Sequence, residues 1–260
     1  MAITAALLGV YGLTQPSPTL STGDTLLLYR TSVDRADEET ARLARDPAVV
    51  RDLALLDKAV AKARTPEELL KDPRVLGVLL QGLGLGDQAA NAGLARAALL
   101  SDPSKPDSLA ARLPDSRWKT AAKRLGLATQ GLAALRDPAT MQQLRDGVLQ
   151  YRRIAAISAK SQAVADAIYV RQLDAAAPPG IYGVLGDAVL RRVATTVAAL
   201  PQQLAVQSVE AQARSLGGRF DVKQLADPQQ REVLIQRYLV MATMGQTTST
   251  PASPLLTLFA

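Results

Sequence analysis

The chain has 260 residues, of which 48% are hydrophobic and only 3% are aromatic, and its 30 basic and 24 acidic residues give a formal charge of +6. It contains no Cys and no His. This excludes thiol nucleophiles, thiolate or imidazole metal sites, Ser-His-Asp triads and haem bound through His. A core made mainly of Leu, Val and Ala favours closely packed helices, because strands are enriched in aromatic and β-branched residues.

The first segment, residues 1–23, carries no charged side chain. Its apolar run from Ala5 to Leu13 has the length of a signal-peptide core, but it lacks a preceding basic region and a following small-x-small cleavage site. We therefore recognise no cleaved signal peptide of the usual kind. No segment approaches the roughly 20 apolar residues that a membrane helix needs, so no membrane span is expected.

Helix starts are the clearest pattern in the chain. An Asp at the N-cap accepts a hydrogen bond from an unpaired backbone N–H, and a Pro in the first turn supplies a helical φ where its missing N–H is not needed. Four Asp-Pro pairs directly precede stretches with apolar residues at helical spacing: Asp46-Pro47, Asp72-Pro73, Asp137-Pro138 and Asp227-Pro228. The sequence therefore predicts an all-α fold.

Further signals divide the first half of the chain. Thr65-Pro66-Glu67-Glu68 is a capping box, in which Glu68 is placed to reach back to the start of the helix. The helix that begins at Asp72 should end in the stretch Gly82 to Gly86, and another helix is expected over 88–100. Two more helix starts are predicted at Pro106 to Leu109 and at Pro114 to Trp118, the second helix ending at Gly126.

The second half predicts one long helix from Asp137 to about Gln172, a break at 175–180 and a last strong helix after Asp227. Residues 24–245 are thus expected to form an irregular multihelical domain, with room for two lobes that meet near 128–136 or 174–180. The Thr-, Ser- and Pro-rich start of residues 246–260 predicts a flexible C-terminal tail. Unevenly spaced helix starts argue against a fixed-period solenoid but leave a loose internal duplication open.

Two patterns resemble chemical motifs. Gly82-x-Gly84-x-Gly86 resembles a phosphate-binding loop, but it follows a predicted helix and not a strand, so a helix end with a turn is favoured. Ser116 and Lys119 have the Ser-x-x-Lys spacing that can place an amine beside a hydroxyl. The companion motifs are missing, and Ser116 fits better as part of a helix start.

Paired acidic and basic residues also have structural roles available to them. Acidic residues in a first helical turn interact favourably with the helix dipole, which accounts for Glu38-Glu39 and Glu67-Glu68. The basic pairs are scattered and lack neighbouring aromatics that would stack on bases, and the single Trp, Trp118, is predicted to anchor the core. We predict no catalytic, cofactor-binding or metal-binding residue. The basic pairs are Lys123-Arg124, Arg152-Arg153 and Arg191-Arg192.

Two stretches carry a family resemblance. The first, Thr65 to Leu127, contains Thr-Pro-Glu-Glu-Leu-Leu-Lys-Asp-Pro and the run Asp115-Ser116-Arg117-Trp118-Lys119; the second contains Ile-Tyr-Gly-Val-Leu-Gly-Asp-Ala-Val-Leu at 181–190, followed by 193–201 and Asp227-Pro228. In this order, over roughly residues 45 to 242, they resemble a family of all-helical bacterial proteins of unknown function encoded among flagellar genes. This chain departs from the family in having Leu where aromatics are expected, at Leu69, Leu70, Leu83 and Leu109.

The resemblance implies a non-enzymatic, flagellum-associated structural or assembly protein whose partners are other flagellar proteins. The family has no assigned catalytic residue, so none is transferred, and no cofactor or small-molecule substrate is expected. The implied location is cytoplasmic or flagellum-associated. The uncharged ends, before Asp24 and after Arg237, would suit docking into a helical partner. Tails that fold on the protein's own core, or disordered tails, would have the same composition.

Two alternatives come from other classes of protein. One is a cytoplasmic helical regulator that binds nucleic acid or an acidic partner through basic helix faces, for which binding would fall steeply with rising salt. The other is an enzyme that uses carboxylates alone, which would need a cleft with converging Asp and Glu side chains. Nucleic acid is not the partner that we favour, because the net charge is mild for the length of the chain.

Overall fold

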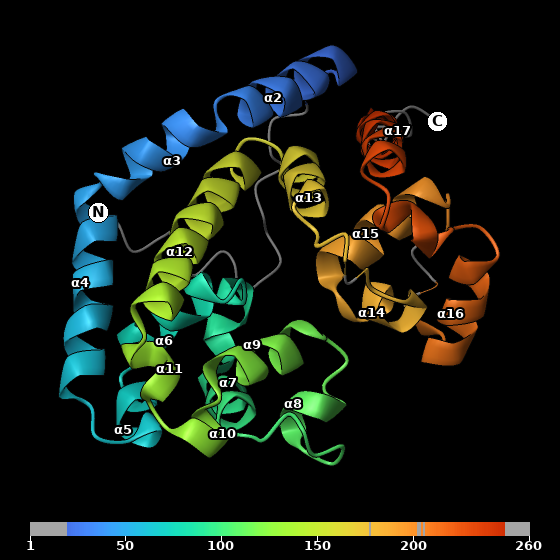
Figure 1. The fold of residues 1–260 in the computed structure, drawn as a ribbon. Helices are drawn as coiled ribbons and strands as arrows, with labels where there is room; N and C mark the ends of the chain where they lie inside the picture. The colour runs from blue at the N-terminus through green and yellow to red at the C-terminus, as the bar shows by residue number, and fades with distance from the viewer. Residues whose placement is uncertain (1–19, 177, 202–203, 205, 248–260) are drawn as a thin grey trace, which may run out of the picture.

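The computed structural model describes residues 20–176, 178–201, 204 and 206–247, and every regular element in this part of the chain is a helix. The predicted all-α multihelical fold is therefore confirmed (Figure 1). The structure describes only residues 20–23 of the predicted uncharged N-terminal segment and only 246–247 of the predicted C-terminal tail. No described helix is long and apolar enough to cross a membrane.

The helices form two groups, one mainly on the left and one mainly on the right of Figure 1, and each group packs around its own hydrophobic cluster. The first cluster, which includes Trp118 as predicted, is formed and bordered by α4 (Pro47–Lys62), α5 (Pro66–Lys71), α6 (Pro73–Gly82), η1 (Gly86–Asn91), α7 (Ala92–Leu99), α8 (Leu109–Arg112), α9 (Arg117–Leu125), α10 (Leu127–Gln130) and α11 (Ala133–Arg136). The second is formed by α2 (Thr22–Asp34), α13 (Gln162–Arg171), α14 (Ile181–Gly186), α15 (Ala188–Val197), α16 (Val209–Gly217), η3 (Val222–Leu225) and α17 (Pro228–Thr247).

Two helices join the clusters: α3 (Ala36–Ala44) and α12 (Pro138–Ser158). Helix α12 contributes Leu144 and Val148 to the first cluster and Ile157 to the second. The change from one core to the other therefore falls inside a continuous helix. The lobe boundary expected near 128–136 or 174–180 stays a prediction; the first range lies in α10 and α11, and the second lies between α13 and α14. Helix α2, the first of the described residues, packs on α13 and α17, so the second cluster combines helices from both ends of the described chain.

The Asp-Pro pairs act as predicted. At all four helix starts the Asp carboxylate accepts a backbone N–H: Asp46 from Ala48 at 2.7 Å, Asp72 from Arg74 at 2.8 Å, Asp137 from Thr140 at 2.9 Å and Asp227 from Gln229 at 2.7 Å. The Thr65 hydroxyl accepts the Glu68 N–H, as a capping box requires. The Glu68 carboxylate, however, accepts the N–H of Arg64, the residue before the expected donor Thr65.

The predicted long helix from Asp137 to Gln172 is wrong, because α12 ends at Ser158 and α13 begins at Gln162. The Ser161 hydroxyl accepts from Val164 N and caps the second helix. Helix α13 is buried on nearly all sides, so apolar residues occur all around it. The apolar spacing of α12 therefore continues into α13 in the sequence, although the chain turns between the two helices. The helix expected over 88–100 is likewise shorter, because residues 86–91 form the 3-10 helix η1.

The glycine stretch after α6 ends a helix, as predicted, and Gly84 adopts a positive φ of 72°. Glycines of this stretch also let α6 and η1 pack closely against α12, which the sequence did not indicate. A Cβ on Gly147 would lie 2.1 Å from the carbonyl oxygen of Gly82, so α6 and α12 are in direct backbone contact. A Cβ on Gly86 would lie 2.4 Å from the ring of Tyr151. These glycines serve helix packing rather than anion binding.

Candidate functional site: a cleft between α8–α9 and α14–α16

A cleft of about 520 Å³ lies where α8 and α9 of the first cluster face α14, α15 and α16 of the second. We call it the interlobe cleft. Helical spacing places its lining side chains on common faces: Tyr182 and Leu185 on α14, Val209 and Gln212 on α16. Ser116 and Lys119 contribute from the start of α9 in the same way. Five helices therefore form the walls, and the sequence separation between them means that only the tertiary fold assembles the cleft.

The base of the cleft is a backbone contact. A Cβ on Gly186 would lie 2.1 Å from the carbonyl oxygen of Pro114, and both residues line the cleft. Only a glycine allows α14 to approach the loop before α9 so closely.

Next to this contact, Arg117 joins several acidic groups. Its Nη2 lies 2.8 Å from Asp115 Oδ2 and 3.1 Å from Asp87 Oδ2, and its Nε lies 3.9 Å from Asp187 Oδ2 across the interface. Nη1 also donates to the Gly84 carbonyl at 2.8 Å. Burial disfavours the charged guanidinium, but Asp115 and Asp87 outweigh it and raise the pKa of Arg117. Arg117 thus fastens the two halves of the cleft together.

Asp187 has two further roles. One oxygen, Oδ1, accepts the N–H groups of Val189 and Leu190 and so caps α15, at 2.8 and 3.0 Å. The other, Oδ2, accepts the Tyr169 hydroxyl at 2.5 Å. Burial first, and then the neighbouring Asp187 carboxylate, raise the pKa of Tyr169. Both carboxylate oxygens of Asp187 therefore accept hydrogen bonds from donors of the same lobe, which fixes the start of α15 beside the cleft.

The cleft itself is apolar with two cations at its border. Two of its large apolar side chains face solvent, since Tyr182 is 59% exposed and Val209 is 52% exposed. Lys119 and Arg191 are exposed and form no ion pair with any residue that the structure describes. No acidic residue is among those that line the cleft in the described part of the chain. Such a surface can bind an apolar group next to a negative charge.

The structure brings Ser116 and Lys119 to this cleft. Ser116 occupies the N-cap position of α9, but its side chain makes no capping bond, and Asp115 Oδ1 accepts the Arg117 N–H instead, at 2.9 Å. The helix-start interpretation of Ser116 therefore holds by position, whereas the capping oxygen belongs to Asp115. Sequence reasoning missed Tyr182, Arg191 and Val209 as residues of a site. The signal available for Tyr182 was its place in the Ile181 to Leu190 stretch that carries the family resemblance.

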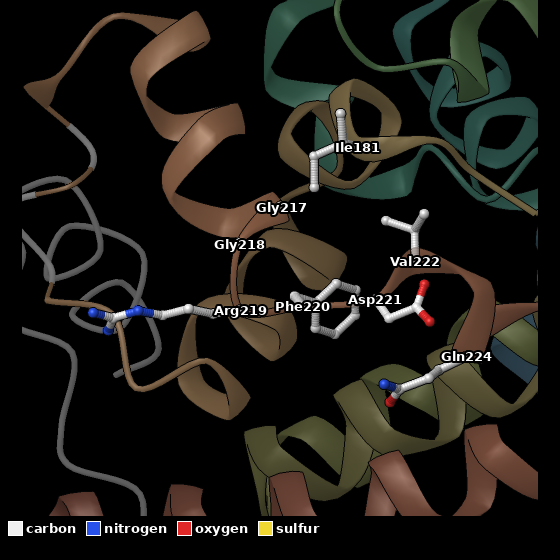
Figure 2. A pocket seen from close by; sticks show the side chains of 8 residues that line it. All are labelled: Ile181, Gly217, Gly218, Arg219, Phe220, Asp221, Val222 and Gln224. Carbon is white, nitrogen blue, oxygen red and sulfur yellow. The ribbon is translucent and has the colours of Figure 1, made fainter.

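A second hollow, of about 440 Å³, lies beside the end of α16 (Figure 2). In Figure 2 the Phe220 ring fills its centre, while the Arg219 side chain extends away from the other labelled side chains. Asp221 already accepts the N–H of Lys223 at 2.9 Å and caps η3. This hollow therefore brings together no set of free polar groups among the residues that the structure describes.

The other residues considered in the sequence lie apart from the cleft. Glu39 forms an ion pair with the buried Arg153 at 3.0 Å, which ties α3 to α12. Arg152 pairs with Asp52 and Arg192 with Asp166, so these basic residues hold helices together and are not free surface charges. Glu67 and Glu68 lie in the first turn of α5, as expected. Among the described residues, no group of three or more acidic side chains could hold a metal ion.

Comparison with known proteins places the fold in context. A crystal structure of a structural-genomics target from Agrobacterium tumefaciens superposes with a TM-score of 0.74 and 22% sequence identity, covering 89% of this chain and 98% of the other. At this identity the match establishes the shared helical fold. No curated protein matches the sequence. A family model described as "Protein of unknown function (DUF1217)" matches residues 82–230, which include the whole interlobe cleft. Because this match spans more than half of the chain, the protein belongs to the DUF1217 family.

Proposed function

We propose that this protein is a non-enzymatic, flagellum-associated structural or assembly protein that acts through protein–protein contacts. The DUF1217 family has no known function. Support for a flagellar role therefore comes from the resemblance of two stretches, Thr65 to Leu127 and Ile181 to Leu190, to proteins encoded among flagellar genes. The interlobe cleft lies where these stretches meet, since Lys119 belongs to the first and Tyr182 to the second. The surface formed by both stretches is thus the part of the molecule to which we assign the contact.

The observation that carries the proposal is the exposure of Tyr182 and Val209 at the mouth of the cleft. Large apolar side chains at a concave surface favour binding of a protein partner, because their burial removes apolar area from water. The acidic residues next to the lining, Asp115 and Asp187, are tied to Arg117, and this favours a binding platform over a catalytic centre.

A second candidate is a cytoplasmic regulator that binds nucleic acid or an acidic partner through basic helix faces. Helix α9 favours it, because Lys119, Lys123 and Arg124 are exposed there and the helix carries no acidic residue. Against nucleic acid stands the use of Arg152, Arg153 and Arg192 in ion pairs within the chain.

The test is an affinity purification of the tagged full-length chain from flagellated cells, at low and moderate salt, with mass spectrometry of the proteins recovered. Rod, hook or export-apparatus proteins recovered at both salt concentrations would support the proposal. A matched purification with residues 1–22 and 247–260 removed tests whether the uncharged ends take part. Nucleic acid recovered only at low salt would favour the second candidate, and the absence of any flagellar protein would contradict the first.

A further inference from the structure

We propose that the interlobe cleft binds a short, acidic amphipathic segment of a partner protein, whose apolar side chain packs against Tyr182 and Val209 and whose carboxylates pair with Lys119 and Arg191. This inference rests on the proposed function because both require a protein partner. It goes further by stating the chemistry of the partner segment that the cleft binds. It does not depend on that partner being flagellar.

The charges at the cleft argue for an acidic occupant. Lys119 and Arg191 border the cleft from different helices, α9 and α15, and no acidic residue lines it within the described chain. Two carboxylates that neighbour lining residues in the chain have other partners: Asp115 pairs with Arg117 at 2.8 Å, and Asp187 accepts from Tyr169 at 2.5 Å. Arg191 Nη1 donates to the Leu185 carbonyl at 3.4 Å, which leaves its charge without an acidic partner among the described residues, as for Lys119. Cations without an acidic partner beside a concave surface attract a negatively charged partner and disfavour a basic one.

Helix α9 extends the positive surface. Lys123 follows Lys119 by one helical turn, so the two exposed side chains share one side of α9, next to the face that buries Trp118 and Ala122. Glu210, in the first turn of α16, is exposed but does not line the cleft. The local balance is therefore positive on the α9 side, where a partner with two or more acidic residues would gain most.

The apolar residues argue for an amphipathic segment over a small anion or a nucleic acid. Tyr182, Leu185 and Val209 give the cleft apolar lining, and the cations Lys119 and Arg191 line the same cleft. Protein interfaces combine the same kinds of group, with aromatic anchors at the centre and charged groups at the rim. A nucleic acid would need more phosphate contacts than two cations provide, and aromatic platforms for its bases.

The ends of the chain itself are a poorer match. Residues 1–23 and those after Arg237 carry no acidic side chain, so they offer the apolar part of the expected ligand without its charges. A folded-back end would make neutral peptides the preferred ligands. The charge of the peptides that the cleft selects therefore distinguishes the two occupants.

The probe is a random peptide library displayed on phage and selected against the full-length protein, followed by affinity measurements on the enriched peptides. We expect enrichment of peptides that combine Asp or Glu with aromatic or aliphatic residues. The variant Lys119→Glu/Arg191→Glu should bind them at least about tenfold more weakly, because it replaces both attractions with repulsions. Lys71→Glu/Arg74→Glu makes the same charge change on exposed positions of α5 and α6 and should leave binding unchanged.

A second pair of variants tests the apolar contact. Tyr182→Ala should weaken binding by about tenfold or more, as truncation of a central aromatic anchor does. Val233→Ala, at a side chain that is 68% exposed on α17, is the matched control. Thermal unfolding of each variant, together with Lys119→Ala as a milder change, separates lost binding from lost folding.

Selection of neutral or basic peptides would overturn the inference, as would equal binding to the Lys119→Glu/Arg191→Glu variant. Enrichment of neutral peptides similar to residues 1–23 or 248–260 would assign the cleft to the ends of the chain instead. If acidic peptides bind at the cleft while the cell purification recovers no flagellar protein, the inference stands and the proposed function fails. If flagellar proteins are recovered equally with Lys119→Glu/Arg191→Glu, the proposed function stands and the inference fails.

Discussion

Gly186 of α14 lies in backbone contact with Pro114, which precedes α9, and a Cβ on Gly186 would lie 2.1 Å from the Pro114 carbonyl oxygen. Both atoms that meet here belong to backbone, so neither can move aside as a flexible side chain could. The two residues are distant in sequence and line the same cleft. The shape of the cleft therefore depends on the absence of one side chain.

Replacing this glycine should separate the walls of the cleft. Gly186→Ala is expected to lower the free energy of unfolding by about 1–3 kcal/mol, the usual cost of inserting a methyl group into a closely packed site. Urea unfolding followed by circular dichroism measures it. Gly77→Ala is the matched control, because no atom lies within 4 Å of its Cβ position on α6, and it should stabilise the helix by up to about 1 kcal/mol. Equal stability of the two variants would contradict the close contact.

The ion pairs of Arg117 should matter more than an exposed pair. Arg117→Met leaves the carboxylates of Asp115 and Asp187, which are 14% and 7% exposed, without their cation. We expect a loss of about 2–3 kcal/mol in unfolding free energy, because a mostly buried charge without a partner is costly. Arg145→Met is the control: it breaks a pair with Asp57 whose side chains are 39% and 42% exposed, and it should cost less than about 1 kcal/mol. A similar loss for both would show that Arg117 holds no buried network.

Alkaline pH should weaken the second cluster. Burial and the neighbouring Glu232 raise the pKa of Tyr29 from 10.0 to about 12. Burial, with Asp187 or Asp166 as the neighbouring charge, also raises the pKa of Tyr169 and that of Tyr238. The folded state thus holds these protons more tightly than the unfolded state does. The free energy that the protonated Tyr29 contributes to folding is therefore fully present below pH 10 and is lost as the pH rises toward 12.

The measurement is the free energy of unfolding in urea at a series of pH values on both sides of the ordinary tyrosine pKa. We expect little change from these phenols until the unfolded chain begins to ionise, and then a steady fall. The fall should be smaller in Tyr29→Phe, which has no proton to lose. The difference in phenolate absorbance between the protein and Tyr29→Phe isolates Tyr29, and its appearance in the folded state before any loss of stability would contradict the raised pKa.

The cap at the start of α6 provides a local test. Asp72→Ala removes the acceptor of the Arg74 N–H, which lies 2.8 Å from Oδ1, and should destabilise the protein by about 1 kcal/mol. Asp72→Asn keeps an oxygen in the same place and should recover most of this loss. Thermal unfolding of the two variants checks the prediction. If alanine is tolerated as well as asparagine, Pro73 alone is sufficient to start the helix.

Local signals made the helix starts predictable. An N-cap bond joins a side chain to a backbone group only two or three residues away, so Asp46, Asp72, Asp137 and Asp227 could be assigned without knowledge of the fold. Gly126, with a φ of 57°, ends α9 as expected for the same reason. The break before α13 was missed because burial on nearly every side removes the polar face that would have marked a change of direction.

The candidate site could be predicted only in part. The sequence by itself determined the helical architecture, the lack of Cys and His chemistry and the position of Trp118 in a core, since each depends on composition or on neighbouring residues. The tertiary structure decided that Lys119 and Tyr182 share a cleft and that Arg117 meets Asp187. These contacts join segments far apart in the chain, and they form only when both hydrophobic clusters are packed and Gly186 reaches Pro114.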